Sequence, residues 1–266
     1  MISCIEYSNI RTDELKNKIK NFVRKPKLCV IQVGDDDASN RYTRNKRIAC
    51  EKVGIVFDHV RLPDNITQKE LESVVYNNQC DYDVDGIIVQ LPLPDHIDVN
   101  RITNLIFPEK DVDGFRRDSY FDPCTPRGIM DWLDYNEVNL RGKVCTVVGR
   151  SEIVGRPMVN MLIKRGATVL NCNSRTANIK RYTKEADIVV SAIGRPNYFN
   201  ENHFSCNQIL IDVGINIDEN GKFCGDISKD VKENVKYGTP VPGGVGKLTV
   251  LRLLENVVEA YERNMK

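Results

Sequence analysis

The stretch VVGRSEIVGRP, Val147 to Pro157, has the order strand, glycine turn and helix that decides the fold of its half of the chain. The small and apolar residues 144–148 are typical of a short buried strand, and the run from Gly155 is typical of a helix. A dinucleotide-binding turn usually has the pattern G-x-G-x-x-G. Here Ser151 occupies the place of the second glycine, and Gly155 falls one residue late. The stretch is therefore either a cofactor loop or only a well-made turn.

The same alternation of strands and helices continues on both sides of this turn. Near-continuous Val, Ile and Leu strands that alternate with helices indicate parallel sheets buried on both faces. The expected strands are 28–34, 56–62, 85–91, 144–148, 168–172, 187–194 and 208–214, and the expected helices include 40–53, 67–78, 99–107, 127–135 and 248–261. Residues 116–124 interrupt the pattern. We therefore expect two α/β domains with a cleft between them, the second containing a Rossmann-like doubly wound parallel sheet.

Composition argues against several classes of function. The chain has 266 residues, of which 41% are hydrophobic and 28% charged, and its formal net charge is +1. This balance gives no electrostatic reason to expect nucleic acid or an anionic membrane as a partner. No apolar run reaches the roughly 18 residues of a membrane span. The N-terminus carries early acidic residues and no continuous apolar region, unlike a signal peptide. We expect a cytoplasmic protein.

The nine cysteines do not form a metal or redox motif. No two of them make a C-x-x-C pair, which zinc sites and dithiol redox sites use. We therefore expect reduced thiols and no metal. Cys124 is the one cysteine expected near a functional site, and a packing role is favoured even there.

A first candidate group lies in the segment SNRYTRNK, which begins at Ser39. Tyr42 and Lys46 are four residues apart on a predicted helix, so their side chains share one face. Ser39 is expected to cap the helix, because its hydroxyl can accept a hydrogen bond from an unpaired amide. Taken alone, Lys46 is better explained as one charge of a solvated face that also carries Arg44 and Arg47.

A second candidate group follows the strand 85–91. Gln90 ends a very apolar run, and an unpaired buried amide there would cost about 1–3 kcal/mol, so it must find partners. Asp111 and Asp113 come next, just before a glycine. Two carboxylates are too few oxygen ligands for a dedicated metal site. A carboxylate that binds a substrate and a plain Asp-rich turn are about equally supported.

The residues around the opening stretch favour NADP over NAD. The hydroxyl of Ser151 can donate to a phosphate at the start of the helix, and Arg150 adds a cation. An acidic residue at the end of the next strand would bind the ribose 2′-hydroxyl of NAD. This chain instead has Asn173, Ser174 and Arg175. A serine and an arginine are suited to a 2′-phosphate.

Seven motifs in order resemble one enzyme family over nearly the whole chain. They are ASxxYxxxK at 38–46, DGIIVQLPLP at 85–94, PEKDVDG at 108–114, PCTPRGI at 123–129, VVGRSxIVGRP at 147–157, DVGIN at 212–216 and TPVPGGVG at 239–246. Together they resemble the bifunctional methylenetetrahydrofolate dehydrogenase/methenyltetrahydrofolate cyclohydrolase family.

The resemblance implies roles for the candidate residues. Lys46 would be the general acid/base, Gln90 would hold it, Asp113 would bind the pteridine ring, and Tyr42 would stack on the aminobenzoyl group. The implied cofactor-binding set is Gly149, Arg150, Ser151, Ser174, Arg175 and Ile215. The opening stretch would then be a phosphate-binding turn with a serine in a glycine's place.

The resemblance also implies an activity and an architecture. The activity is NADP-dependent oxidation of 5,10-methylenetetrahydrofolate, followed by hydrolysis of the methenyl product to 10-formyltetrahydrofolate, within purine biosynthesis. Residues 1–120 with 247–266 would form the folate-binding catalytic domain, and 121–246 the NADP-binding domain. The final helix would return to the N-terminal domain. The implied partners are tetrahydrofolate derivatives and a second copy of the chain, as a homodimer.

Three departures from the family pattern keep alternatives open. The segment 115–122 is shorter than usual, Lys247 and Leu248 replace Pro and Met, and Asn173 replaces a His. The short segment leaves open a monofunctional dehydrogenase or a non-catalytic nucleotide-binding regulator. Retention of Lys46 argues against a regulator, as does retention of Gln90 and Asp113. Shikimate-type dehydrogenases form a further alternative, against which the Tyr42–Lys46 spacing argues.

Overall fold

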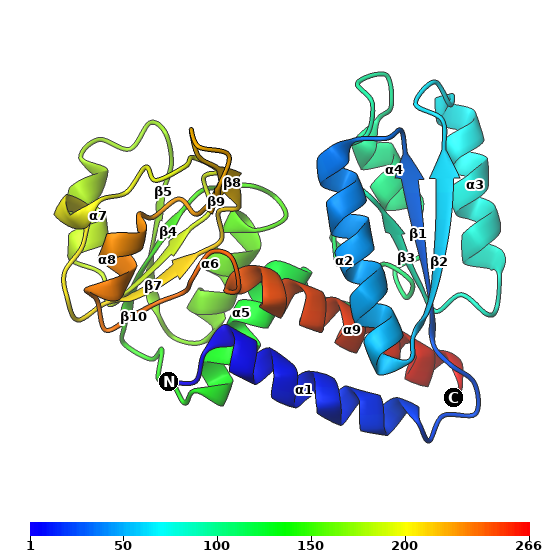
Figure 1. The fold of residues 1–266 in the computed structure, drawn as a ribbon, viewed down its shortest axis with the longest axis horizontal. Helices are drawn as coiled ribbons and strands as arrows, with labels where there is room; N and C mark the ends of the chain where they lie inside the picture. The colour runs from blue at the N-terminus through cyan, green and yellow to red at the C-terminus, as the bar shows by residue number, and fades with distance from the viewer. The chain divides into compact units, whose positions relative to one another are not determined.

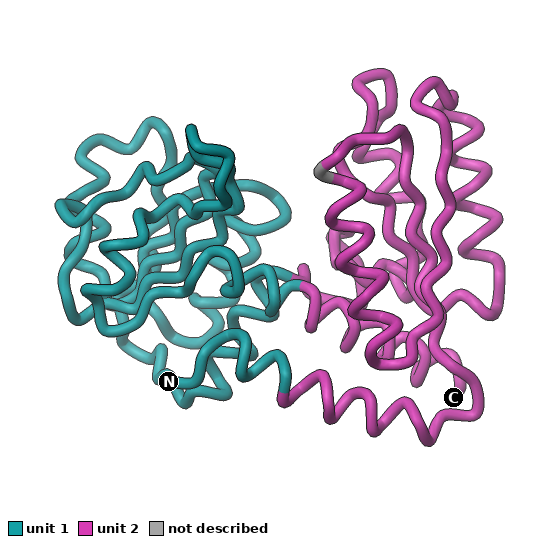
Figure 2. Tube along the Cα trace, in the orientation of Figure 1, with its two compact units in different colours: residues 1–9, 125–249 teal, residues 10–124, 250–266 magenta. Residues whose placement is uncertain are grey.

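Residues 1–37 and 39–266 are described by the computed structural model, and they form two compact units (Figure 2). Unit 1 comprises residues 1–9 and 125–249, and unit 2 comprises residues 10–124 and 250–266. Helices α1 (Cys4–Ile19) and α9 (Val245–Asn264) contribute residues to both units. The predicted folate-binding domain, 1–120 with 247–266, and the predicted NADP-binding domain, 121–246, are defined by the ligand that each binds. These limits therefore stay a prediction. Within the described residues, no helix has both the length and the apolar character needed to cross a membrane.

Unit 2 is built on a three-stranded parallel sheet in the order β2-β1-β3 (Figure 1). Its elements, besides its parts of α1 and α9, are β1 (Lys27–Val33), α2 (Asp37–Val53), β2 (Val56–Leu62), α3 (Gln68–Cys80), β3 (Gly86–Val89) and α4 (Val99–Leu105). Side chains of the central strand alternate between two cores, as the period of a strand requires. Leu28 and Val30 contact buried residues of α1, α2 and α9. Cys29, Ile31 and Val33 contact those of α3 and α4.

Helix α9 completes the first of these two cores. Leu253, Leu254, Val257 and Val258 are buried in the same cluster as Leu28 of β1. The predicted return of the final helix to the N-terminal domain is thereby confirmed.

Unit 1 contains a five-stranded parallel sheet in the order β10-β7-β6-β4-β5 and a small antiparallel hairpin, β8-β9. Its elements, besides its parts of α1 and α9, are α5 (Cys124–Tyr135, from Thr125 on), β4 (Val144–Val148), α6 (Gly155–Lys164), β5 (Thr168–Cys172), α7 (Ile179–Lys184), β6 (Ile188–Ser191), the 3-10 turn η1 (Glu201–His203), β7 (Ile209–Asp212), β8 (Asn216–Ile217), β9 (Phe223–Cys224), α8 (Lys229–Glu233) and β10 (Tyr237–Gly238). One core contains side chains of β4 to β7 with Val231 of α8. Trp132, Met158 and Leu162 of α5 and α6 are also buried.

The α/β class, the parallel sheets and the Rossmann-like second half were predicted correctly, but several details were not. Ser39 does not cap α2; Asp36 is the N-cap, and its carboxylate accepts a hydrogen bond from the Ser39 amide at 2.8 Å. A carboxylate one turn earlier satisfies that amide, so the helix begins at Asp37. Helix α1 and the short elements β8 to β10 and α8 were not predicted.

Candidate active site

Lys46 and Gln90 lie together in unit 2. Lys46 is half-buried on α2, and its Nζ donates to Oε1 of Gln90 at 3.1 Å. Gln90 directly follows β3, is 8% exposed, and donates from Nε2 to the carbonyl of Leu91 at 2.7 Å. Both ends of this amide are therefore bonded, which orients its oxygen toward the ammonium group. The solvated-face interpretation holds for the exposed Arg44 but not for Lys46.

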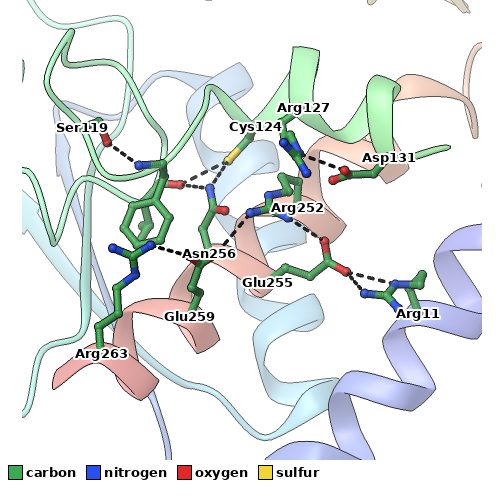
Figure 3. Close-up of polar contacts among 12 residues, drawn as sticks. Arg11, Ser119, Cys124, Arg127, Asp131, Arg252, Glu255, Asn256, Glu259 and Arg263 are labelled. Carbon is green, nitrogen blue, oxygen red and sulfur yellow. Dashed lines mark hydrogen bonds and ion pairs between the residues drawn. The ribbon is translucent and has the colours of Figure 1, made fainter. Parts of the chain in front are cut away.

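Asp113 is fixed through its backbone. Its carbonyl accepts a hydrogen bond from the Cys124 amide at 3.3 Å. The preceding carbonyl, of Val112, accepts from Nδ2 of Asn256 at 2.7 Å and from Sγ of Cys124 at 3.2 Å. Figure 3 shows the Cys124 and Asn256 side chains pointing toward this carbonyl. Within the described part of the chain, the Asp113 carboxylate has no hydrogen bond or ion pair, so it is available to a ligand.

The buried thiol of Cys124 lies within electrostatic range of charged groups of the candidate site. Burial raises its pKa well above the ordinary value, and the charges of Asp113, Arg252 and Lys46 also act on it. Burial therefore keeps this thiol protonated and inert, and the candidate acid/base and the candidate folate-binding carboxylate lie close enough for their charges to act on it. The packing role predicted for Cys124 agrees with this environment. Asn256, from α9, was missed by sequence reasoning, because nothing local signals its contact with residue 112.

Tyr42 and Asp111 differ in exposure. Tyr42 lies on α2 one turn before Lys46, is 43% exposed, and has a pKa raised by partial burial, so its phenol is neutral near pH 7. Asp111 is 2% exposed, and its Oδ2 accepts from the Arg116 amide at 2.9 Å. Burial raises the pKa of Asp111. Of the two predicted carboxylates, Asp111 is a structural group that bonds the segment 115–122, and Asp113 is partly exposed.

The opening stretch forms a tight turn in unit 1. Gly149 has a φ of +124°, and a Cβ there would lie 2.4 Å from the Ala192 carbonyl oxygen. A Cβ on Gly155 would lie 2.5 Å from the Gly149 oxygen, so both positions need glycine. Oγ of Ser151 accepts from the Gly155 amide at 3.2 Å. That bond uses a lone pair and leaves the Ser151 hydroxyl hydrogen to donate to a phosphate.

Asn171, on the neighbouring strand β5, also holds this turn in place, and sequence reasoning missed it. Its Nδ2 donates to the Gly149 carbonyl at 2.7 Å and to the Val147 carbonyl at 3.0 Å. Asparagine is depleted in strands, so its place inside the apolar strand β5 was a usable signal.

The end of β5 presents polar groups without an acid. Asn173 forms a turn in which its Oδ1 accepts from the Arg175 amide at 3.0 Å. Ser174, Arg175 and Arg150 are exposed, and Ile215 is 45% exposed after β7. Two arginines and a hydroxyl, with no acidic residue among residues 171–175, fit a 2′-phosphate. Among the described residues, no cluster of three or more His, Cys, Asp or Glu is placed to hold a metal ion.

Comparison with known proteins identifies close relatives. Residues 2–113 match the family described as tetrahydrofolate dehydrogenase/cyclohydrolase, catalytic domain, and residues 123–265 match its NAD(P)-binding domain. The bifunctional protein FolD of Vesicomyosocius okutanii is 45% identical over 258 residues, covering 93% of each chain.

Two solved structures are similar over nearly their full length. The bifunctional FolD of Campylobacter jejuni aligns with a TM-score of 0.95 and 41% identity, covering 98% of both chains. The Trypanosoma brucei enzyme, solved with NADP cofactor and an inhibitor, aligns with a TM-score of 0.93 and 32% identity, covering 100% of this chain and 98% of that one. These matches confirm the resemblance that the seven motifs indicated.

Proposed function

This chain belongs to the tetrahydrofolate dehydrogenase/cyclohydrolase family, and on that premise we propose that it catalyses two successive reactions. The first is NADP-dependent oxidation of 5,10-methylenetetrahydrofolate to 5,10-methenyltetrahydrofolate. The second is hydrolysis of that product to 10-formyltetrahydrofolate. Family membership argues for an enzyme over a non-catalytic regulator and over a shikimate-type dehydrogenase.

The observation that carries the proposal is the contact between Lys46 and Gln90. The 3.1 Å bond holds an ammonium group beside the carboxyl end of β3, where ligands of parallel sheets bind. In the hydrolysis, Lys46 in its neutral amine form accepts a proton from the attacking water, and the ammonium group so formed gives a proton to the folate nitrogen whose bond to the one-carbon unit breaks. Gln90 keeps Nζ of Lys46 in position through both transfers.

The neighbouring residues bind the folate. The unbonded carboxylate of Asp113 accepts hydrogen bonds from N–H groups of the pteridine ring. The half-exposed ring of Tyr42 stacks on the aminobenzoyl group. These contacts place the one-carbon unit at Lys46. Bound NADP supplies the acceptor for the hydride that leaves this unit in the oxidation.

The cofactor is held by unit 1. Gly149 and Gly155 form the tight turn, Ser151 donates to the pyrophosphate, and the α6 amides receive its charge. Arg150, Ser174 and Arg175 bind the 2′-phosphate, and Ile215 contacts the nicotinamide half. The absence of an acid from the turn at Asn173 supports NADP as the preferred cofactor.

One assay tests the proposal. Purified protein is mixed with 5,10-methylenetetrahydrofolate and NADP, and in parallel with NAD, while reduced cofactor and methenyl product are followed. We expect faster reduction of NADP than of NAD, followed by decay of the methenyl product faster than in buffer. Oxidation without accelerated decay would support the monofunctional alternative, and absence of both reactions would overturn the proposal.

We further propose that the enzyme is a cytoplasmic homodimer that supplies one-carbon units for purine biosynthesis. All nine cysteines are free thiols, which supports a reducing compartment. The cross-strand pair Ile217 and Phe223 of the β8-β9 hairpin is 51% and 48% exposed, which supports self-association through this hairpin. Sedimentation equilibrium should give twice the mass of one chain, and Ile217→Asp should lower it. A monomeric wild type would contradict the homodimer.

A further inference from the structure

Three charged side chains are buried where β6 and β7 end in unit 1. Asp226 is 0% exposed, Asp212 is 1% exposed, and the side chain of Lys232 is 8% exposed. Burying charges is costly unless they are paired and fully hydrogen-bonded. None of the three belongs to the proposed set of cofactor-binding residues.

Asp226 binds the loop that follows β6. Its Oδ2 accepts from Oγ of Ser191 and from the Ile193 amide, each at 2.9 Å. Its Oδ1 accepts from the Arg195 amide at 2.9 Å and from Nδ2 of Asn216 at 3.0 Å. Each oxygen thus accepts two hydrogen bonds. Together they fix the backbone at residues 193 and 195 and the side chain of Asn216, which follows Ile215 in the chain.

Asp212 and Lys232 hold Asp226 in place. Asp212 accepts from the amides of Asp226 and Ile227 at 2.9 and 3.0 Å, and from Nζ of Lys232 at 2.9 Å. Burial raises the pKa of Asp212, whereas Lys232 opposes that shift. The arrangement needs close backbone approach, because a Cβ on Gly225 would lie 1.9 Å from Oδ2 of Asp212.

The loop that Asp226 fixes adjoins the cofactor turn. In the sheet order, β4 has β5 on one side and β6 on the other, so the direction of chain progression changes at β4. A dinucleotide crosses such a point, and its nicotinamide half lies over the strands opposite the ribose-binding strand. Those strands are β6 and β7. The 2.4 Å separation between a Cβ on Gly149 and the Ala192 oxygen places the loop directly beside the phosphate turn.

We propose that Asp226 is a positioning residue for the nicotinamide half of NADP, acting through the 192–195 loop and Asn216. The ion pair of Asp212 and Lys232 supports it by fixing the backbone of residues 226 and 227. This inference rests on the proposed function, because it concerns how that reaction's cofactor is oriented.

The direct test is Asp226→Asn, with NADP affinity measured by calorimetry and the KM values for NADP and folate measured separately. An amide has one oxygen where the carboxylate has two, so its NH2 must face a backbone N–H of either Ile193 or Arg195. We expect the Kd and KM for NADP to rise about tenfold or more. The KM for the folate should change little. A purely structural defect would lower all activities together through loss of folded protein.

Ser191→Ala provides a milder test if Asp226→Asn does not fold. Ser191 is fully buried in β6 and its hydroxyl donates to Oδ2 of Asp226, so Ser191→Ala removes one of the four hydrogen bonds that orient this carboxylate. We expect its Kd for NADP to rise by about three- to tenfold, which is less than loss of a direct hydrogen bond to a charged group would cause, because Ser191 acts only through Asp226.

Two lysines of α8 provide a test variant and its matched control for the ion pair between Asp212 and Lys232. Lys232→Met leaves Asp212 buried without its cation and should weaken NADP binding. Lys229→Met, at a side chain that is 85% exposed, should leave NADP binding unchanged. Wild-type NADP affinity in both Asp226→Asn and Ser191→Ala, in an otherwise active enzyme, would overturn this inference alone. A wild type that neither binds NADP nor reduces it would overturn the proposed function and this inference with it.

Discussion

Asp113 combines a fixed backbone with an unbonded carboxylate. The neighbouring carbonyl of Val112 is held by Asn256 at 2.7 Å, and the carbonyl of Asp113 is held by the Cys124 amide at 3.3 Å. The position of the residue therefore does not depend on its own side chain. A side chain of this kind is expected to serve a ligand rather than the fold.

Asp113→Ala should consequently impair both reactions without unfolding the protein. We expect the KM for the folate to rise by about tenfold or more in oxidation and hydrolysis alike, because one charge-assisted contact is lost. Both KM values and a thermal melt on the same preparation measure this. An unchanged KM in both reactions would show that Asp113 does not bind the folate.

Arg150→Ala should separate the two nicotinamide cofactors. Arg150 is exposed and lies directly after Gly149, so its loss removes a cation without disturbing the turn. We expect the KM for NADP to rise by about ten- to a hundredfold and the KM for NAD to change much less. Equal losses with both cofactors would mean that Arg150 does not read the 2′-phosphate.

His59 should make the stability of unit 2 depend on pH. Its Nε2 donates to Oε1 of Gln32 at 3.1 Å, so its Nδ1 accepts from Arg47 in the neutral form. Burial, Arg47 and Arg61 lower its pKa below the usual 6.5. The folded state therefore takes up this proton less readily than the unfolded state, and stability falls as pH drops from about 6.5 through the lowered pKa. Urea unfolding at pH 7.5 and 5.5 should show a smaller difference for His59→Gln than for the wild type; an equal difference would contradict this assignment.

The glycine turn between β4 and α6 shows how an element constrains its residues. A side chain on Gly149 would meet the backbone of Ala192, and one on Gly155 would meet the backbone of Gly149, so neither position tolerates a side chain. Ser151, in contrast, occupies a position where the usual glycine is not required, since its side chain is exposed and bonds the Gly155 amide. The departure from G-x-G-x-x-G thus preserves the turn.

Gly155→Ala should damage this turn. The new methyl group would lie 2.5 Å from the Gly149 oxygen, and relief requires movement of the backbone. We expect a destabilisation of about 1–3 kcal/mol, typical of overpacking, with NADP affinity reduced more than folate affinity. Thermal melts and calorimetric titrations measure both effects. Wild-type affinity for NADP would show that the turn does not contact the cofactor.

The elements that escaped prediction share physical reasons. Helix α1 buries Ser8 and Thr12 along with Cys4 and Tyr7, so polar residues at core positions hide its apolar periodicity. Strands β8, β9 and β10 have two residues each, too few for any period to be visible. The central strands β1, β3, β6 and β7, in contrast, were predictable because their side chains are buried on both faces, which makes each a continuous apolar run.

The whole molecule explains why the candidate site could be predicted only in part. Gln90 directly follows β3, and Lys46 lies on α2, the helix after the neighbouring strand β1, so the rule that ligands collect at carboxyl ends predicts this pair. Asn256 donates to the carbonyl of Val112, which is 144 residues away in the sequence. Asp212 accepts from the amide of Asp226 in the buried interior of unit 1. Such contacts depend on tertiary packing, and no local pattern announces them.

The central claim is that Lys46 is the proton-transfer group of the hydrolysis, and Lys46→Met tests it most directly. Both reactions are measured on one preparation, with Lys52→Met, an exposed lysine of the same helix, as the control. We predict that methenyl hydrolysis falls about 10²- to 10⁴-fold in Lys46→Met and stays at the wild-type rate in Lys52→Met. Hydrolysis at the wild-type rate by folded Lys46→Met protein would contradict the account.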